Sequence, residues 1–145
     1  MASELRVTTI ANNAGTESVD TTYVINGSAK AWCNFNGQGT VAFRNSLNCT
    51  SLVDNGTGDY EVSYVSNFAD IGYSLSFNSF GFAGSRGGGF VGSKVTSLLN
   101  PNAVAQSNIL TSGHHFQCGM AADASSHGSA SEPDVVCLDV NGDLA

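Results

Sequence analysis

Hydrophobic and polar residues alternate with a period of two over most of this chain, in short segments separated by turn-forming residues. The alternation is clearest over residues 29–35, 59–64, 73–77, 114–120 and 135–140. It is typical of antiparallel strands that bury one face and expose the other. We therefore predict an all-β fold, an antiparallel β-sandwich of the jelly-roll-like or barrel-like kind.

The strongest local signal is a hairpin around residues 54–58. Asn55-Gly56 is expected to supply the positive φ angles of a tight reversal. The strand that follows places Tyr60, Val62 and Tyr64 on one side. A register slip of one residue would expose all three side chains, so we expect them to be buried.

The segments around this hairpin are less regular. Residues 40–43 are expected to form a strand, and apolar positions from Leu47 to Val53 are expected to continue its pairing toward the hairpin. Residues 79–93 and 121–133 are rich in Gly, Ser and Ala and are predicted to be variable surface loops. Helical spacing is found only at residues 95–99, before Asn100-Pro101.

The N-terminal region differs from the rest. We predict an arm over residues 1–22, for assembly or attachment, and a β-sandwich domain over residues 23–145. The arm has one short strand signal, from Leu5 to Ile10, and its candidate assembly residues are Leu5, Val7 and Ile10. A lone strand gains little stability, so we expect it to pair with a neighbour, such as another copy of the chain.

Composition narrows the possible partners. The 145 residues suit one domain, and a net charge of −7 provides no basic surface for nucleic acid. No apolar run approaches the ~18 residues of a membrane span, so we expect no membrane insertion. The first residues lack the pattern of an export signal. We therefore expect synthesis in a cytoplasm, which favours free thiols at Cys33, Cys49, Cys118 and Cys137.

Motifs that would indicate chemistry are incomplete. His114 and His115 are neighbours on a predicted strand, so they face opposite sides and cannot both bind one metal ion without a bulge. Residues 139–143 resemble the start of a calcium-binding loop but lack its later glycine and glutamate. The glycine-rich residues 84–89 lack the Lys-Ser/Thr pair of a phosphate-binding loop. We expect no catalytic residues, no cofactor and no metal.

Several segments carry a resemblance to a known family. Residues 27–41, 44–49 and 54–62 are the specific ones, and residues 5–16 and 136–143 are similar as well. Together they resemble a module of tailed-bacteriophage structural proteins, especially marine ones, that are often labelled tail fibre proteins. Cys33 and Cys49 stand where we expect a valine-like residue in that family, which favours buried packing over a redox role. The resemblance implies a β-rich virion protein that commonly assembles as a trimer and has no catalytic residues.

The expected function is therefore that of a structural protein on the surface of a tailed-phage virion, of the tail-fibre or tail-tip type and involved in host attachment. The alternative is a capsid decoration protein that stabilises the head shell. Expected partners are further copies of the chain, other virion proteins and a host cell-surface receptor. The candidate recognition surface comprises Phe80, Phe82, Arg86, Phe90, His114 and His115, although at least two of the phenylalanines are expected to fill the core instead.

Overall fold

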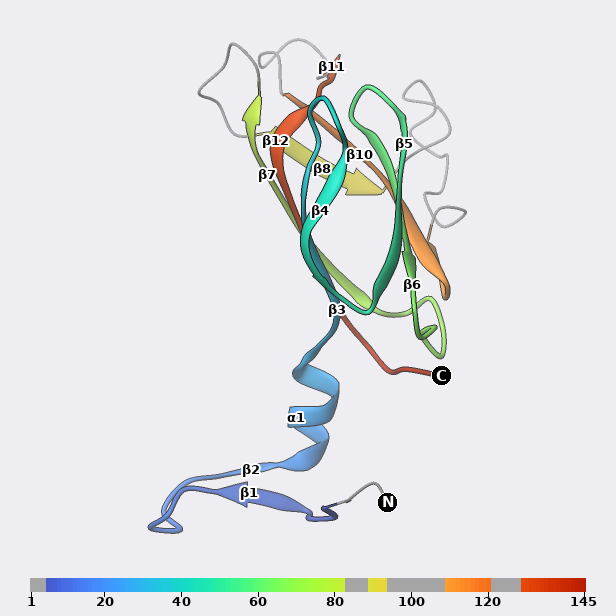
Figure 1. The fold of residues 1–145 in the computed structure, drawn as a ribbon. Coiled ribbons are helices and arrows are strands. Elements are labelled where there is room, and N and C mark those ends of the chain that lie inside the picture. Colours follow the sequence, from blue (N-terminus) through green and yellow to red (C-terminus); the bar gives the residue numbers. More distant parts are fainter. Residues whose placement is uncertain (1–4, 83–88, 94–108, 121–128) are drawn as a thin grey trace.

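The structure is a computed structural model, and it describes residues 5–82, 89–93, 109–120 and 129–145 (Figure 1). The described chain is mostly antiparallel β-structure with one short helix. Its strands form two larger sheets and a separate N-terminal hairpin. The predicted all-β class is confirmed at this level.

The first large sheet has four strands in the order β4-β3-β12-β7. Their bounds are Ala42–Leu47 for β4, Ala29–Asn36 for β3, Pro133–Asn141 for β12 and Ser74–Phe82 for β7. The C-terminal strand β12 lies between β3 and β7, which are far from it in the sequence. The centre of this sheet is therefore built entirely from long-range pairings.

The second large sheet has β10 at its centre. The path β11-β10-β6-β5 is extended by β8 and β9, which also pair with β10. The six strands are β5 (Cys49–Gly56), β6 (Asp59–Tyr64), β8 (Gly89–Ser93), β9 (Ile109–Leu110), β10 (Gly113–Met120) and β11 (Ser129–Ala130).

The apolar faces of the two sheets contact each other and form the core. The predicted inward positions of β6, namely Tyr60, Val62 and Tyr64, are all buried, which confirms the expected register. Burying apolar surface in this way contributes about 25 cal/mol per Å² to stability. The core also holds these side chains from the other segments: Ala31, Cys33, Phe35, Phe68, Tyr73, Phe116, Cys118, Val136, Leu138 and Val140.

The expectation that pairing continues from residue 40 to residue 53 was wrong. Strand β4 ends at Leu47 in the four-stranded sheet, and β5 begins at Cys49 in the six-stranded sheet. Asn48 turns the chain between them with a φ of 54°, a left-handed conformation that asparagine tolerates better than most residues. One apparent strand is therefore two strands in different sheets.

The predicted hairpin is present, but its tight turn lies later than expected. Strands β5 and β6 pair as expected, and the reversal occurs at Thr57 and Gly58. Gly58 has a φ of 66°. Of the two residues predicted to have positive φ angles, Gly56 has one, at 125°, and Asn55 does not. The pairing shifts between Asp54 and Gly56, which accommodates Asn55 as an extra residue.

The two predicted loops are shorter than expected. Strand β7 extends to Phe82, and β8 occupies Gly89–Ser93, so much of the segment 79–93 is paired backbone. Likewise, β11 and the start of β12 fall inside the segment 121–133. Pairing with β10 and β12 supplies hydrogen bonds that the loop-like composition does not reveal. The predicted helical turn at residues 95–99 lies outside the described residues.

The N-terminal arm is a hairpin followed by a helix. Strand β1 (Thr9–Ala11) pairs with β2 (Ser18–Asp20) of the same chain, so the expected lone strand is paired internally. Helix α1 (Thr21–Gly27) was not predicted, and it spans the expected boundary between residues 22 and 23. Figure 1 shows that the hairpin and α1 project from the end of the sheets where β3 begins. We refer to residues 5–28 as the arm.

Gly58 offers a test of how closely the hairpin turn approaches β10 and the connection between β11 and β12. A Cβ atom there would lie 2.6 Å from the Ser131 carbonyl oxygen and even closer to that of Cys118, whereas Gly39 has a similar φ and open space. Gly58→Ala is expected to lower the free energy of unfolding by roughly 3 kcal/mol, the sum of left-handed strain and crowding. Gly39→Ala should cost about 1 kcal/mol, from strain only. Urea unfolding measures both, and equal losses would refute the close approach.

Candidate functional site

The arm carries an apolar cleft between its hairpin and its helix. The cleft has a volume of about 430 Å³ and is lined by Leu5, Arg6, Val7, Ile10, Thr21, Val24 and Ile25. The predicted assembly residues Leu5, Val7 and Ile10 thus lie together, beside helical residues that the sequence analysis missed. Leu5 is 84% exposed, and α1 has no buried residue. The apolar surface of the arm is therefore available for contact with another molecule.

Local hydrogen bonds hold the parts of the arm together. Asp20 caps α1, because its side chain accepts a hydrogen bond from the Thr22 N–H at 2.7 Å. The Thr22 side chain, and then this backbone bond, lower the pKa of the Asp20 carboxyl by hydrogen bonding. The Thr21 hydroxyl donates to the Val7 carbonyl at 3.0 Å, which ties the helix to the hairpin. The sequence contained this signal, since Asp20 precedes the apolar residues of the helix at a typical N-cap position.

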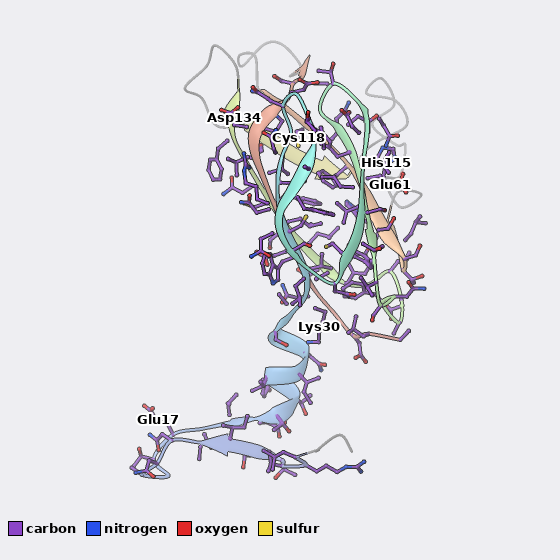
Figure 2. The ribbon with its side chains drawn as sticks, viewed as in Figure 1. Glu17, Lys30, Glu61, His115, Cys118 and Asp134 are labelled. Atoms are coloured by element: carbon purple, nitrogen blue, oxygen red, sulfur yellow. The ribbon has the colours of Figure 1, made fainter. Side chains whose placement is uncertain are left out.

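Lys30 connects the arm to the sheet. Its ammonium donates to the carbonyl oxygens of Ile25 and Ser28, the latter at 3.0 Å, and to the Ser28 hydroxyl at 2.8 Å. A cation at the C-terminal end of a helix interacts favourably with the unpaired carbonyls there. Figure 2 shows Lys30 at the junction of α1 and β3. The direction of the arm is therefore fixed partly by one side chain of the first sheet strand.

A second group of exposed apolar residues lies at the end of the sheets that is next to the arm. Asn141 pairs with Ala29, and the following residues up to Ala145 bond to the β6–β7 loop at Asn67 and Ala69. That loop also bonds to Thr111 and to Asn48. We call this region the arm-proximal end. Its exposed large hydrophobic residues are Leu47, Val65, Ile71, Leu110 and Leu144.

The opposite end of the sheets has a polar depression. It has a volume of about 300 Å³ and is lined by Gln38, Thr57, Ser131 and Glu132. The Gln38 amide donates to the carbonyl oxygens of Gly81 and Glu132 at 3.1 and 3.0 Å. These contacts join the β3–β4 connection to the end of β7 and to the β11–β12 connection, which are distant from it in the sequence. We call this region the distal end.

The structure does not gather the predicted recognition residues on one surface. Phe80 is 48% exposed on β7 of the four-stranded sheet, whereas His115 lies on β10 of the six-stranded sheet. Phe82 pairs with Pro133, and Phe90 pairs with Gly119, so both belong to strands. Arg86 lies outside the described residues.

His114 corrects the predicted surface. It is 1% exposed and packs between the sheets, with its ring centroid 5.4 Å from that of Phe77 and 6.0 Å from that of Phe116. The physical reason is strand alternation, because His114 shares the inward phase of Phe116 and Cys118. Burial lowers the pKa of His114 to about 4, with a smaller contribution from the nearby His115. His114 is therefore a neutral core residue near pH 7 and not a receptor contact.

His115 faces the other way and forms a polar pair. Its Nε2 lies 2.6 Å from the Asp59 carboxylate oxygen, and both side chains are partly exposed. Glu61 is directly opposite His115 across the pairing of β6 and β10. Figure 2 shows Glu61 and His115 close together on the same side of the sheet. His115, Asp59 and Glu61 therefore form a partly exposed polar group on this part of the six-stranded sheet.

The described residues contain no group of three or more His, Cys, Asp or Glu side chains placed to hold a metal ion. Within the same ranges, no helix is long and apolar enough to cross a membrane. Comparisons of the chain with protein-family models, curated proteins and solved structures found no match.

The buried histidine leads to a pH prediction. Because the folded pKa of His114 is about 4 and its ordinary value is 6.5, the unfolded chain binds this proton first as the pH falls. The stability linked to neutral His114 is complete above pH 6.5 and is lost as the pH falls through 6.5 toward 4, by up to about 3 kcal/mol. His114→Leu should show a smaller fall in unfolding free energy between pH 7 and pH 4. Equal falls in variant and wild type would contradict this account.

Proposed function

We propose that this chain is a non-enzymatic structural protein on the surface of a tailed-phage virion, of the tail-fibre or tail-tip type, with a role in host attachment. The family resemblance of residues 27–41 and 54–62 supports this proposal. Residues 29–36 of the first segment form β3, and residues 59–62 of the second lie in β6; the inward faces of both strands line the core. We further propose that the two facing sheets constitute a β-sandwich.

One observation carries the proposal: exposed apolar residues are unequally distributed over the molecule. Among the residues whose side-chain exposure the structure describes, which leave out 82–108 and 120–129, all exposed large hydrophobic side chains except Val53 and Phe80 belong to the arm or to the arm-proximal end. Contiguous exposed apolar surface marks contact sites in proteins. One end of the molecule is therefore suited to permanent assembly, while the other remains available for transient contacts.

The occupant that best fits the arm is another copy of the chain. A two-stranded hairpin and a seven-residue helix have little stability without tertiary contacts. Each copy provides both an apolar arm and an apolar arm-proximal end, so the arm of one copy can cover that end of the next. Such head-to-tail contacts close into a ring when the rotation between copies permits it. We propose a homotrimer with this arrangement, held by the arm to other virion proteins.

The distal end would then face the host. Its polar depression and the outward pair of His115 and Asp59 offer hydrogen-bonding groups. Weak contacts of this kind gain strength when several copies bind at once. A trimer presented repeatedly on one particle would supply that multiplicity.

The assembly proposal is tested by changing the charge of the arm. The wild-type chain is expected to show the mass of a trimer by light scattering at micromolar concentration. Ile25→Glu places a charge in the apolar cleft and should yield monomers of 14.9 kDa. Val53→Glu changes an exposed residue outside the interface and should leave the trimer intact. A monomeric wild-type chain would contradict the proposal.

The position on the virion is tested by copy number. Quantitative mass spectrometry of purified particles should find few copies of the chain relative to the major capsid subunit if it belongs to the tail. A copy number comparable to that of the capsid subunit would favour the alternative, a capsid decoration protein. Absence of the chain from purified particles would refute both.

A further inference from the structure

The corner between the two sheets is held by a small set of side chains. The chain leaves the four-stranded sheet at Leu47 and enters the six-stranded sheet at Cys49. The Asn48 side chain ties this corner to the β6–β7 loop by two hydrogen bonds. Its Oδ1 atom accepts a hydrogen bond from the Ser66 N–H at 2.7 Å, and its Nδ2 atom donates one to the Ser66 carbonyl oxygen at 3.1 Å. The position of Cys49 is therefore well defined relative to both sheets.

Two thiols meet at this corner. Cys33 is on β3, points between the sheets and is 2% exposed. Cys49 is the first residue of β5 and is half-buried. The Cys49 Sγ atom lies 3.4 Å from the carbonyl oxygen of Trp32, the residue before Cys33, and Cys49 packs against the buried cluster that contains Cys33. In this position the Cys33 side chain acts as a hydrogen-bonding neighbour of the Cys49 thiol. A thiol of one sheet thus contacts a thiol of the other.

The same contact makes the two thiols unequal. The hydrogen bond from Cys33 lowers the pKa of the Cys49 thiol, against the opposing effect of its burial. The pKa of Cys33 is raised, first by this hydrogen bond and then by burial. The more accessible sulfur is therefore the one that ionises more readily. Because the thiolate is the reactive form, Cys49 is suited to react first with a reagent in solution.

We propose that Cys33 and Cys49 form a disulfide bond that joins the two sheets when the protein meets an oxidising solution. The oxidant is a low-molecular-weight disulfide such as oxidised glutathione. This step goes beyond the proposed function, which supplies only the setting: a virion leaves the reducing cytoplasm when its host lyses.

The reaction proceeds by two thiol–disulfide exchanges. The Cys49 thiolate attacks one sulfur of the oxidised glutathione, whose S–S bond breaks and releases one glutathione thiolate. Cys33 then gives its proton to solvent and attacks the Cys49 sulfur of the mixed disulfide, which releases the second glutathione. The two protein thiols lose two protons and two electrons in total, and one glutathione disulfide is reduced to two thiols.

The other two cysteines are placed differently. Cys118 is fully buried on β10, and burial raises the pKa of its thiol to about 12. Cys137 lies opposite Asn34 in the pairing of β12 with β3, and its sulfur accepts a hydrogen bond from the Asn34 amide at 3.1 Å. Since Asn34 and Cys33 are adjacent on a strand, Cys137 is on the face opposite Cys33. The pairing is therefore specific to Cys33 and Cys49.

Mass spectrometry tests the bond on the purified chain. Reduced protein is incubated with oxidised glutathione, quenched with acid, alkylated and digested with trypsin. Cleavage after Lys30, Arg44 and Arg86 places Cys33 in the peptide 31–44 and Cys49 in the peptide 45–86. The expected product is a cross-link of these two peptides that dithiothreitol releases. Unlinked peptides, or a cross-link through another cysteine, would overturn the proposal.

Variants and a melting measurement complete the test. Cys137→Ser is the matched control and should form the cross-link as the wild type does, whereas Cys49→Ser should form none. Oxidation should raise the melting temperature of wild type and Cys137→Ser by roughly 10 °C, because the bond closes the loop through β4. An unchanged melting temperature in cross-linked wild type would overturn the stabilising role. These measurements use the isolated chain. A missing disulfide would therefore refute only the disulfide proposal, and the virion proposal is tested separately by copy number.

Discussion

The structure depends on an aromatic contact between the two sheets. Phe35 of β3 packs edge-on against Tyr60 of β6 with ring centroids 5.1 Å apart, and Phe116 of β10 lies about equally far from both. All three rings are fully buried. The Tyr60 hydroxyl donates to the Gly37 carbonyl at 2.6 Å, so its polar group is satisfied inside the core. This cluster fixes which face of every neighbouring strand points inward.

Once the inward faces are fixed, the two ends of the molecule acquire different surfaces. The arm leaves from the start of β3, next to the C-terminal residues after β12. Of the exposed apolar side chains that the structure describes, most lie on the arm or at this end. The polar depression at Gln38 and Glu132 lies at the other end. An apolar arm at one end and a polar depression at the other are the surfaces expected of a protein that is anchored at one end and exposed at the other. The proposed bond between Cys33 and Cys49 would join the two sheets near the arm-proximal end.

The sequence predictions failed where pairing with a distant strand gave a residue a conformation other than the turn or loop that its type prefers. Asn55-Gly56 has the composition of a tight turn, yet pairing of Asp54 with Tyr60 makes Asn55 an extra residue and moves the turn to Gly58. Residues 79–82 and 89–93 have the composition of a loop, yet they pair with β12 and β10. In each case hydrogen bonds with other strands outweigh the low strand propensity of these residues, which amounts to at most about 1 kcal/mol per residue.

The sequence by itself determined the strand periodicity, and with it the buried faces of β3, β6 and β12, because alternation along a strand is a local property. It also placed His114 and His115 on opposite faces. Only the tertiary structure decided which strands share a sheet, that the chain changes sheets at Asn48, and that Cys33 meets Cys49. Those features come from contacts between residues far apart in the chain, and such contacts produce no local pattern of hydrophobic and polar residues from which they could be predicted.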